Sequence, residues 1–136
     1  MSEVRGRINT GAKMAIVVRA WWSFVSVEVG RRRFPLPMLV QRLRGRSRAD
    51  VPVIQPARLG HIVGRVVRLG PYRPRCLTLS LVLYRMLAEQ GEQPELVIGL
   101  PRVARSKDAH AWVEVDGADV GPPPGRGDHQ ELARYP

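Results

Sequence analysis

Residues 76–90 decide the fold, and their sequence is CLTLSLVLYRMLAEQ. Apolar side chains fall on two adjoining faces of a helix, with Leu77, Leu81, Tyr84 and Ala88 on one and Leu79, Leu83 and Met86 on the other. Apolar residues on most sides are typical of a helix that is buried within a domain. Pro74 comes just before the stretch, and Gly91 follows where a helix C′ residue belongs. The stretch therefore predicts a central, buried helix.

Two apolar stretches after this helix predict β-strands. Residues 95–100 form a short apolar run, which is long enough for one strand. Residues 109–115, AHAWVEV, lead into Asp116-Gly117, a pair that favours a two-residue hairpin turn. Residues 118–120 would then form the return strand.

The first half of the chain predicts short helices joined by proline-rich links. Residues 14–29 are apolar without a clean period, and they fit either a helix or a pair of strands. Residues 38–43 have the pattern of a short amphipathic helix. Residues 58–69 have helical spacing and are closed by Gly70-Pro71.

These elements predict an α+β fold in three parts. Residues 1–57 would form an N-terminal helical and linker region, and residues 122–136 a C-terminal tail. Residues 58–121 would form the core, in which the central helix packs on a small antiparallel β-sheet. We interpret residues 102–108 as a charged loop, and the proline-rich tail as a loop or a partly disordered end.

The composition fits a soluble domain, with 44% apolar residues in a chain of 136. Its longest apolar run, Met14 to Val29, contains Arg19 and Glu28 and falls short of a membrane span. The run also lacks a signal-peptide cleavage pattern. We therefore expect a cytoplasmic protein without a membrane segment.

The formal net charge of +10 first suggests a polyanionic partner. Almost all the basic residues are arginines, however, and Lys13 and Lys107 are the only lysines. The two densest runs, residues 31–33 and 42–48, are interpreted as solvated faces, with an acidic partner as the alternative. The chain has no zinc-finger or RNP-like motif, which argues against nucleic acid.

Cys76, the single cysteine, stands at the start of the predicted central helix. One cysteine excludes an intrachain disulfide and a cysteine-based structural metal site. The helix dipole and the unpaired N–H groups of the first turn favour a thiolate, and Arg73 and Arg75 add positive charge. The same N–H groups would hold a carbonyl oxygen as it gains charge.

A thiol nucleophile needs a base within hydrogen-bonding reach, and His110 is the best candidate. It belongs to the predicted strand 109–115, where Trp112 would shield the site from water. A lone cysteine and a lone histidine are each more often structural, so it is their combination that favours catalysis. His61 is interpreted as a packed or capping residue, and His129 as a solvated residue of the tail.

At these residues the chain resembles the stand-alone leader peptidases of lasso-peptide biosynthesis, a transglutaminase-like branch of the papain-like cysteine enzymes. The likeness rests on four blocks: Arg75–Leu81 (RCLTLSL), Gly91, Val97–Gly99 (VIG) and Ala109–Gly117 (AHAWVEVDG). It covers roughly residues 60–125 and is specific only when the blocks are taken together. The resemblance implies a transglutaminase-like core over residues 58–121.

The resemblance also implies an activity, in which Cys76 attacks a peptide carbonyl and His110 protonates the leaving amine. The bond cut would join leader and core in a ribosomally made precursor, before a macrocyclase acts. Larger members carry a leader-recognition domain, and this chain is too short to include one. The expected partners are therefore the precursor leader, a separate recognition protein and, as a further candidate, the macrocyclase. No cofactor and no metal are expected.

One position departs from the family's pattern, which usually has an acid on the return strand to orient the imidazole. Pro122 stands there instead. A two-residue turn pairs Glu114 with Asp119, which puts Asp119 on the face of His110. It would lie four residues nearer the turn, about 13 Å along the strand, which is too far for contact without a bulge.

The third member of the site is therefore open. It is Asp119 through such a distortion, a tail acid such as Asp128, a backbone carbonyl, or absent; Asp116, at the turn itself, is no better placed. A Cys–His dyad functions without a third member, although its histidine is less firmly held.

Two further functions compete with the peptidase. A transglutaminase-like site with the same nucleophile would transfer the acyl group to an amine. A non-catalytic module would instead use its arginine-rich surface to hold a peptide or nucleic acid.

Overall fold

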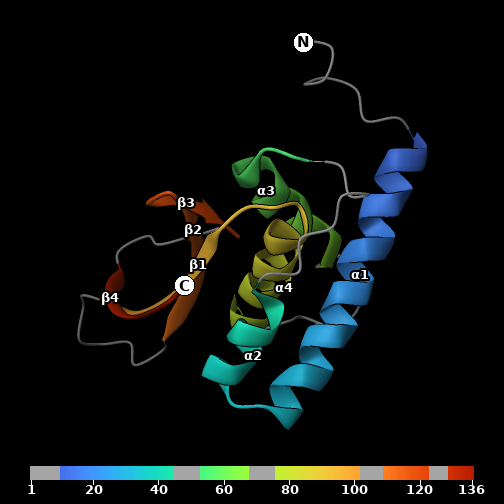
Figure 1. Cartoon of the computed structure of the whole chain (residues 1–136). Coiled ribbons are helices and arrows are strands. Elements are labelled where there is room, and N and C mark those ends of the chain that lie inside the picture. Colours follow the sequence, from blue (N-terminus) through green and yellow to red (C-terminus); the bar gives the residue numbers. More distant parts are fainter. Residues whose placement is uncertain (1–9, 45–52, 68–75, 102–108, 123–128) are drawn as a thin grey trace.

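The computed structural model describes residues 10–44, 53–67, 76–101, 109–122 and 129–136. In these residues the elements follow in the order α1 (Thr10–Arg33), α2 (Leu36–Leu43), α3 (Pro56–Val67), α4 (Cys76–Glu89), β1 (Pro94–Pro101), β2 (His110–Val115), β3 (Ala118–Gly121) and β4 (His129–Tyr135) (Figure 1). The helices gather on one side of a four-stranded antiparallel sheet. The predicted α+β fold is confirmed.

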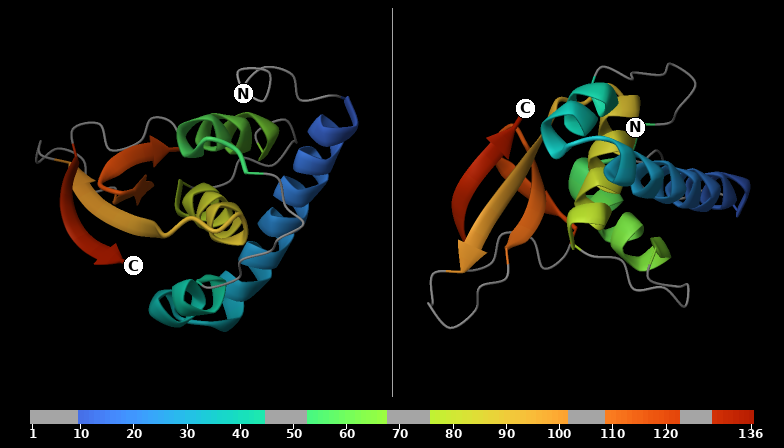
Figure 2. Two further views of the ribbon diagram at one scale, coloured as in Figure 1. Left: turned by 45° about the horizontal axis from the view of Figure 1, so that its top comes forward. Right: turned by 90° about the horizontal axis from the view of Figure 1, so that it is seen from below.

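Helix α4 is the predicted central helix, and it lies between α1 and the sheet (Figure 2). All residues from Thr78 to Glu89 are buried. The helix ends at Glu89 and is terminated by Gly91, whose φ of 91° is one that glycine adopts without strain. Glu92 N–H donates to the Leu87 carbonyl at 3.0 Å, and Gly91 N–H to that of Ala88 at 3.1 Å. These two bonds form a Schellman motif, as the position of Gly91 predicts.

Residues 14–29 belong to the single helix α1, so the alternative of two strands is wrong. The helix runs antiparallel to α4, since Arg19 pairs with Glu89 at 3.6 Å and Glu28 accepts a hydrogen bond from Thr78 at 2.8 Å. Within the described residues, no helix combines the length and apolarity needed to cross a bilayer.

The two amphipathic helices of the first half are confirmed. The predicted segment 38–43 lies in α2, which starts two residues before it. The predicted segment 58–69 is α3 up to Val67, and its last two residues lie outside the described part of the chain.

The sheet has the strand order β3-β2-β1-β4. At the hairpin, Asp116 and Gly117 both have positive φ, 52° and 80°, as a two-residue type I′ turn requires. Glu114 pairs with Asp119, in the register counted from the sequence. The next pair is Val113 with Gly121, so Val120 is the extra residue of a β-bulge.

The expectation of a loop after Gly121 is wrong for residues 129–135, which form β4 and pair with β1. Ile98 pairs with Ala133 and Gly99 with Glu131, so Leu132 is bulged out, and 64% of it is exposed. The bulge breaks the two-residue alternation by which a strand is recognised in a sequence. Charged residues are also typical of an edge strand, which is why this segment has the composition of a tail.

Candidate active site

Cys76 is the first residue of α4, and its side chain is half-buried while the helix from Thr78 onward is buried. It packs against the apolar core together with Leu77. The bond from Thr78 to Glu28 ties the first turn of α4 to α1. The thiol therefore stands at the accessible end of a fixed helix, beside backbone N–H groups that lack helical partners.

His110 is the first residue of β2 and pairs with Gly99 of β1. Its ring is stacked on Trp112, with centroids 6.2 Å apart and planes inclined by 29°. Trp112 is fully buried. Gly99 leaves room for the Trp112 ring, because a Cβ at Gly99 would lie 2.8 Å from Cη2 of the indole. Trp112 thus lies beside His110 on the same face of β2.

The beginnings of α4 and β2 lie toward the same end of the molecule, where β1 also ends (right-hand view of Figure 2). Along β2, however, His110 and Trp112 alternate with Ala111 and Val113, and it is the latter two that join the core packed on α4. Cys76 and His110 therefore lie toward the same end of the molecule, with His110 on the face of β2 opposite to the residues that pack on α4. They do not face each other across the packed interface between the helix and the sheet.

His129 lies beside His110, with ring centroids 4.7 Å apart and planes inclined by 34°. It is also 6.4 Å from Trp112 and is half-buried, so its interpretation as a solvated tail residue is wrong. No sequence signal points to this neighbour, because the bulged strand that carries it lacks a strand pattern. His61, interpreted as packed or capping, is instead exposed on α3.

The candidate acids occupy different places. Asp119 is exposed opposite Glu114, and its Oδ1 accepts a hydrogen bond from the N–H of Gly121 at 2.9 Å. This position is four residues further along β2 than His110, about 13 Å along an ideal strand. Asp116 is exposed in the turn. Asp128 lies outside the described residues.

The described residues contain no group of three or more His, Cys, Asp or Glu side chains that could hold a metal ion.

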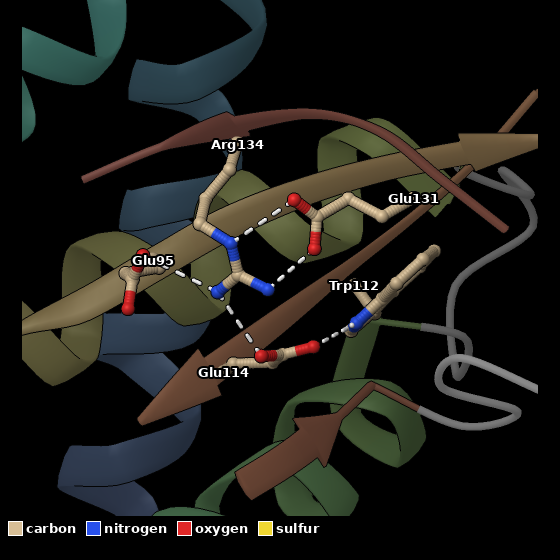
Figure 3. A network of polar contacts seen from close by, with 5 residues as sticks. All are labelled: Glu95, Trp112, Glu114, Glu131 and Arg134. Atoms are coloured by element: carbon tan, nitrogen blue, oxygen red, sulfur yellow. Dashed lines mark hydrogen bonds and ion pairs between the residues drawn. The ribbon is translucent and has the colours of Figure 1, made fainter. Parts of the chain in front are cut away.

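Figure 3 shows a polar network that includes Trp112 and Glu114 of β2. By strand alternation these two residues lie on the same face of the sheet as His110. Arg134 Nη1 donates to Glu114 at 3.1 Å and to Glu95 at 3.2 Å, and its Nη2 donates to Glu131. The bonds to Glu131, first of all, raise the pKa of Arg134 above its usual value. Glu114 in turn accepts from Nε1 of Trp112 at 2.8 Å. The network thus fixes the indole that flanks His110.

Replacing Arg134 by Met is expected to lower the free energy of unfolding by about 1–3 kcal/mol, because the Glu114 carboxylate stays buried and loses its cation. Urea denaturation measures this loss. Glu131→Gln is the matched control, since its side chain is 38% exposed and an exposed pair contributes about 0–1 kcal/mol. Equal effects of the two changes would contradict the conclusion that the buried pair of Arg134 with Glu114 contributes more stability than the exposed pair with Glu131.

A family model described as "Transglutaminase-like superfamily" matches residues 21–134. The match includes α1 from Trp21 onward and nearly all of β4, and so extends well beyond the blocks recognised in the sequence. No curated protein and no solved structure gives a match.

Proposed function

The chain belongs to the transglutaminase-like superfamily, and from this premise we propose that it is a cysteine peptidase that removes the leader from a ribosomally made lasso-peptide precursor. Cys76 is its nucleophile and His110 its general base and acid. A separate recognition protein presents the precursor, and a macrocyclase acts on the released core.

The observation that carries this proposal is the position of Cys76. A half-buried thiol stands at the first residue of an otherwise buried central helix, at the end of the molecule where β2 begins with His110. The positive end of the helix dipole favours the thiolate, and the N–H groups of the first turn, which have no acceptor within the helix, favour an oxyanion.

The proposed reaction runs in two halves. His110 takes the proton of the Cys76 thiol, Sγ attacks the carbonyl carbon of the scissile bond, and the carbonyl oxygen gains charge beside the α4 N–H groups. The imidazolium then gives its proton to the leaving nitrogen, which frees the core α-amine and leaves a thioester. His110 next takes a proton from water, the hydroxide attacks the thioester, and the returned proton restores the thiol as the leader carboxylate departs.

This reaction requires the His110 imidazole to turn from the outer face of the sheet toward Sγ. In the described state the neighbours of this imidazole are the His129 and Trp112 rings, so the reaction requires it to leave both rings and the backbone at the start of β2 to turn with it.

Asp119 is assigned to the hairpin in this proposal and not to the reacting pair. Its Oδ1 caps the Gly121 N–H, and Asn keeps that oxygen while removing the charge. Asp119→Asn is therefore expected to keep kcat/KM within about threefold of the unmodified enzyme, as exposed substitutions change free energies by about 0.5 kcal/mol. A loss of a hundredfold or more would instead place Asp119 against the imidazole.

The experiment that tests the function mixes this protein, a candidate precursor and its recognition protein, and follows the masses of leader and core. The proposal predicts two fragments whose masses add up to the mass of the precursor plus one water. Incubation with a primary amine tests acyl transfer: a leader that gains the mass of the amine in place of water makes the acyltransferase the better description. Salt-sensitive nucleic-acid binding without any cleavage would favour the binding module.

A further inference from the structure

Helix α1 has two apolar faces, and the fold uses one of them. Its buried face includes Ile16, Ala20 and Val27. Five of the nine large apolar side chains that are exposed among the described residues also belong to α1: Met14, Val18, Trp22, Val25 and Val29. We call these five residues the α1 stripe.

The α1 stripe lies on one line along the helix. Its spacings of four, four, three and four residues keep the five side chains within about 80° of one another at 3.6 residues per turn. The same geometry places the stripe about 180° from the buried face. The stripe therefore lies on the side of α1 opposite to the residues that pack on the rest of the molecule.

The exposure of these side chains is large, between 47% for Val29 and 65% for Trp22. Single exposed apolar residues need no explanation, but an aligned set on one helix marks an interaction surface. The stripe extends about 22 Å, which is the length of four turns of a partner helix. Spacings of three and four residues are those by which two helices pack along their length.

The charged residues beside the stripe indicate the charge of the partner that it binds. Val17 lies between the stripe and the buried face of α1, and it lines a groove of about 440 Å³ between α1 and α3 whose polar residues are Arg58, His61 and Arg65. The groove has no acidic lining residue.

A second groove of about 270 Å³ follows the other end of the stripe, at Val25, Val29 and Arg32. Its one acidic residue, Glu28, is engaged by Thr78 and by Arg31 at 3.3 Å. Val17 and Phe24, which line the two grooves, lie on the same side of the stripe at 3.6 residues per turn, so this side of the stripe is basic near both of its ends, in a chain of net charge +10. A second copy would bring like charges together, whereas an acidic helix would bring opposite ones.

We propose that the α1 stripe binds an amphipathic helix of another protein, one whose apolar face is bordered by acidic residues. The stripe covers the apolar face of that helix, and the arginines of the two grooves meet its acidic residues. This inference does not depend on the chemistry of Cys76.

The test uses two synthetic 22-residue helices with leucine at the a and d positions and either glutamate or lysine at e and g. Each is titrated into the whole protein while tryptophan emission is recorded, because Trp22 is exposed and Trp112 is already buried. The glutamate helix should bind, shift the emission to the blue, and bind more weakly as salt is added. The lysine helix should bind at least about tenfold more weakly.

Two variants locate the site. Val18→Gln combined with Val25→Gln should weaken binding of the glutamate helix by about tenfold or more. Leu132→Gln should leave binding unchanged, because it removes an equally exposed apolar side chain on β4. Equal binding of both helices, no binding of the glutamate helix, or equal effects of the two variants would each overturn the proposal.

Sedimentation of the protein alone tests the competing occupant. The proposal predicts a monomer at micromolar concentration. A dimer that the Val18→Gln, Val25→Gln variant dissociates would show that the stripe pairs with its own copy, and would overturn it.

Discussion

Replacing either Cys76 or His110 by Ala is expected to lower kcat/KM for precursor cleavage by about 10⁴-fold or more. Removal of Sγ leaves no atom to form the thioester, and removal of the imidazole leaves neither a base for the thiol nor an acid for the leaving amine. The two residues act as one unit, so the double variant should be no slower than either single one. Single-turnover cleavage followed by mass measures all three.

Neither change should unfold the protein, since both side chains are half-buried at the first residue of an element. Circular dichroism and urea denaturation of the variants provide that control. Cleavage that persists in a folded Cys76→Ala variant would contradict the proposed nucleophile. Cleavage that is lost for Cys76→Ala and kept for His110→Ala would support Cys76 as the nucleophile and exclude His110 as its base.

Gly60→Ala is expected to destabilise the fold by about 2 kcal/mol net. A Cβ at Gly60 would lie 1.9 Å from the carbonyl oxygen of Val120, so α3 and β3 would have to separate. Overpacking of this kind costs about 3 kcal/mol when backbone must move, against about 1 kcal/mol gained in helix propensity. Urea denaturation measures the difference.

Gly30→Ala is the matched control, because it is also a buried glycine within a helix. The nearest atom to its Cβ is Cδ1 of Leu39 at 2.8 Å, the end of a flexible side chain. The propensity gain and a small repacking cost should nearly cancel, which leaves stability almost unchanged. Similar losses for the two variants would contradict the close approach of α3 to β3.

Much of the fold could be predicted because local chemistry and tertiary packing agree there. The run of apolar residues in 76–90 ends at Gly91, and Asp116-Gly117 demands one kind of turn; both predictions are confirmed. The sequence of α1 was ambiguous for a physical reason. Apolar residues on its two opposite faces cancel the periodicity by which a helix is recognised.

The site was harder to predict than the fold. Cys76 and His110 could be singled out because each stands at the beginning of a recognisable element. His129 could not, because its contact with His110 depends on the pairing of β4 with β1 across a bulge. The face of the sheet on which the His110 side chain lies is set by strand alternation. The number of residues between the Cys76 and His110 motifs carries no information about it.

The most direct test of the central claim is the rate at which iodoacetamide alkylates Cys76 at neutral pH. Because Cys76 is the single cysteine of the chain, the mass of the intact protein reports this one thiol. An activated nucleophile predicts alkylation faster than that of a free thiol, and slower alkylation in the His110→Ala variant. A rate equal to that of a free thiol and unchanged by His110→Ala would contradict the account.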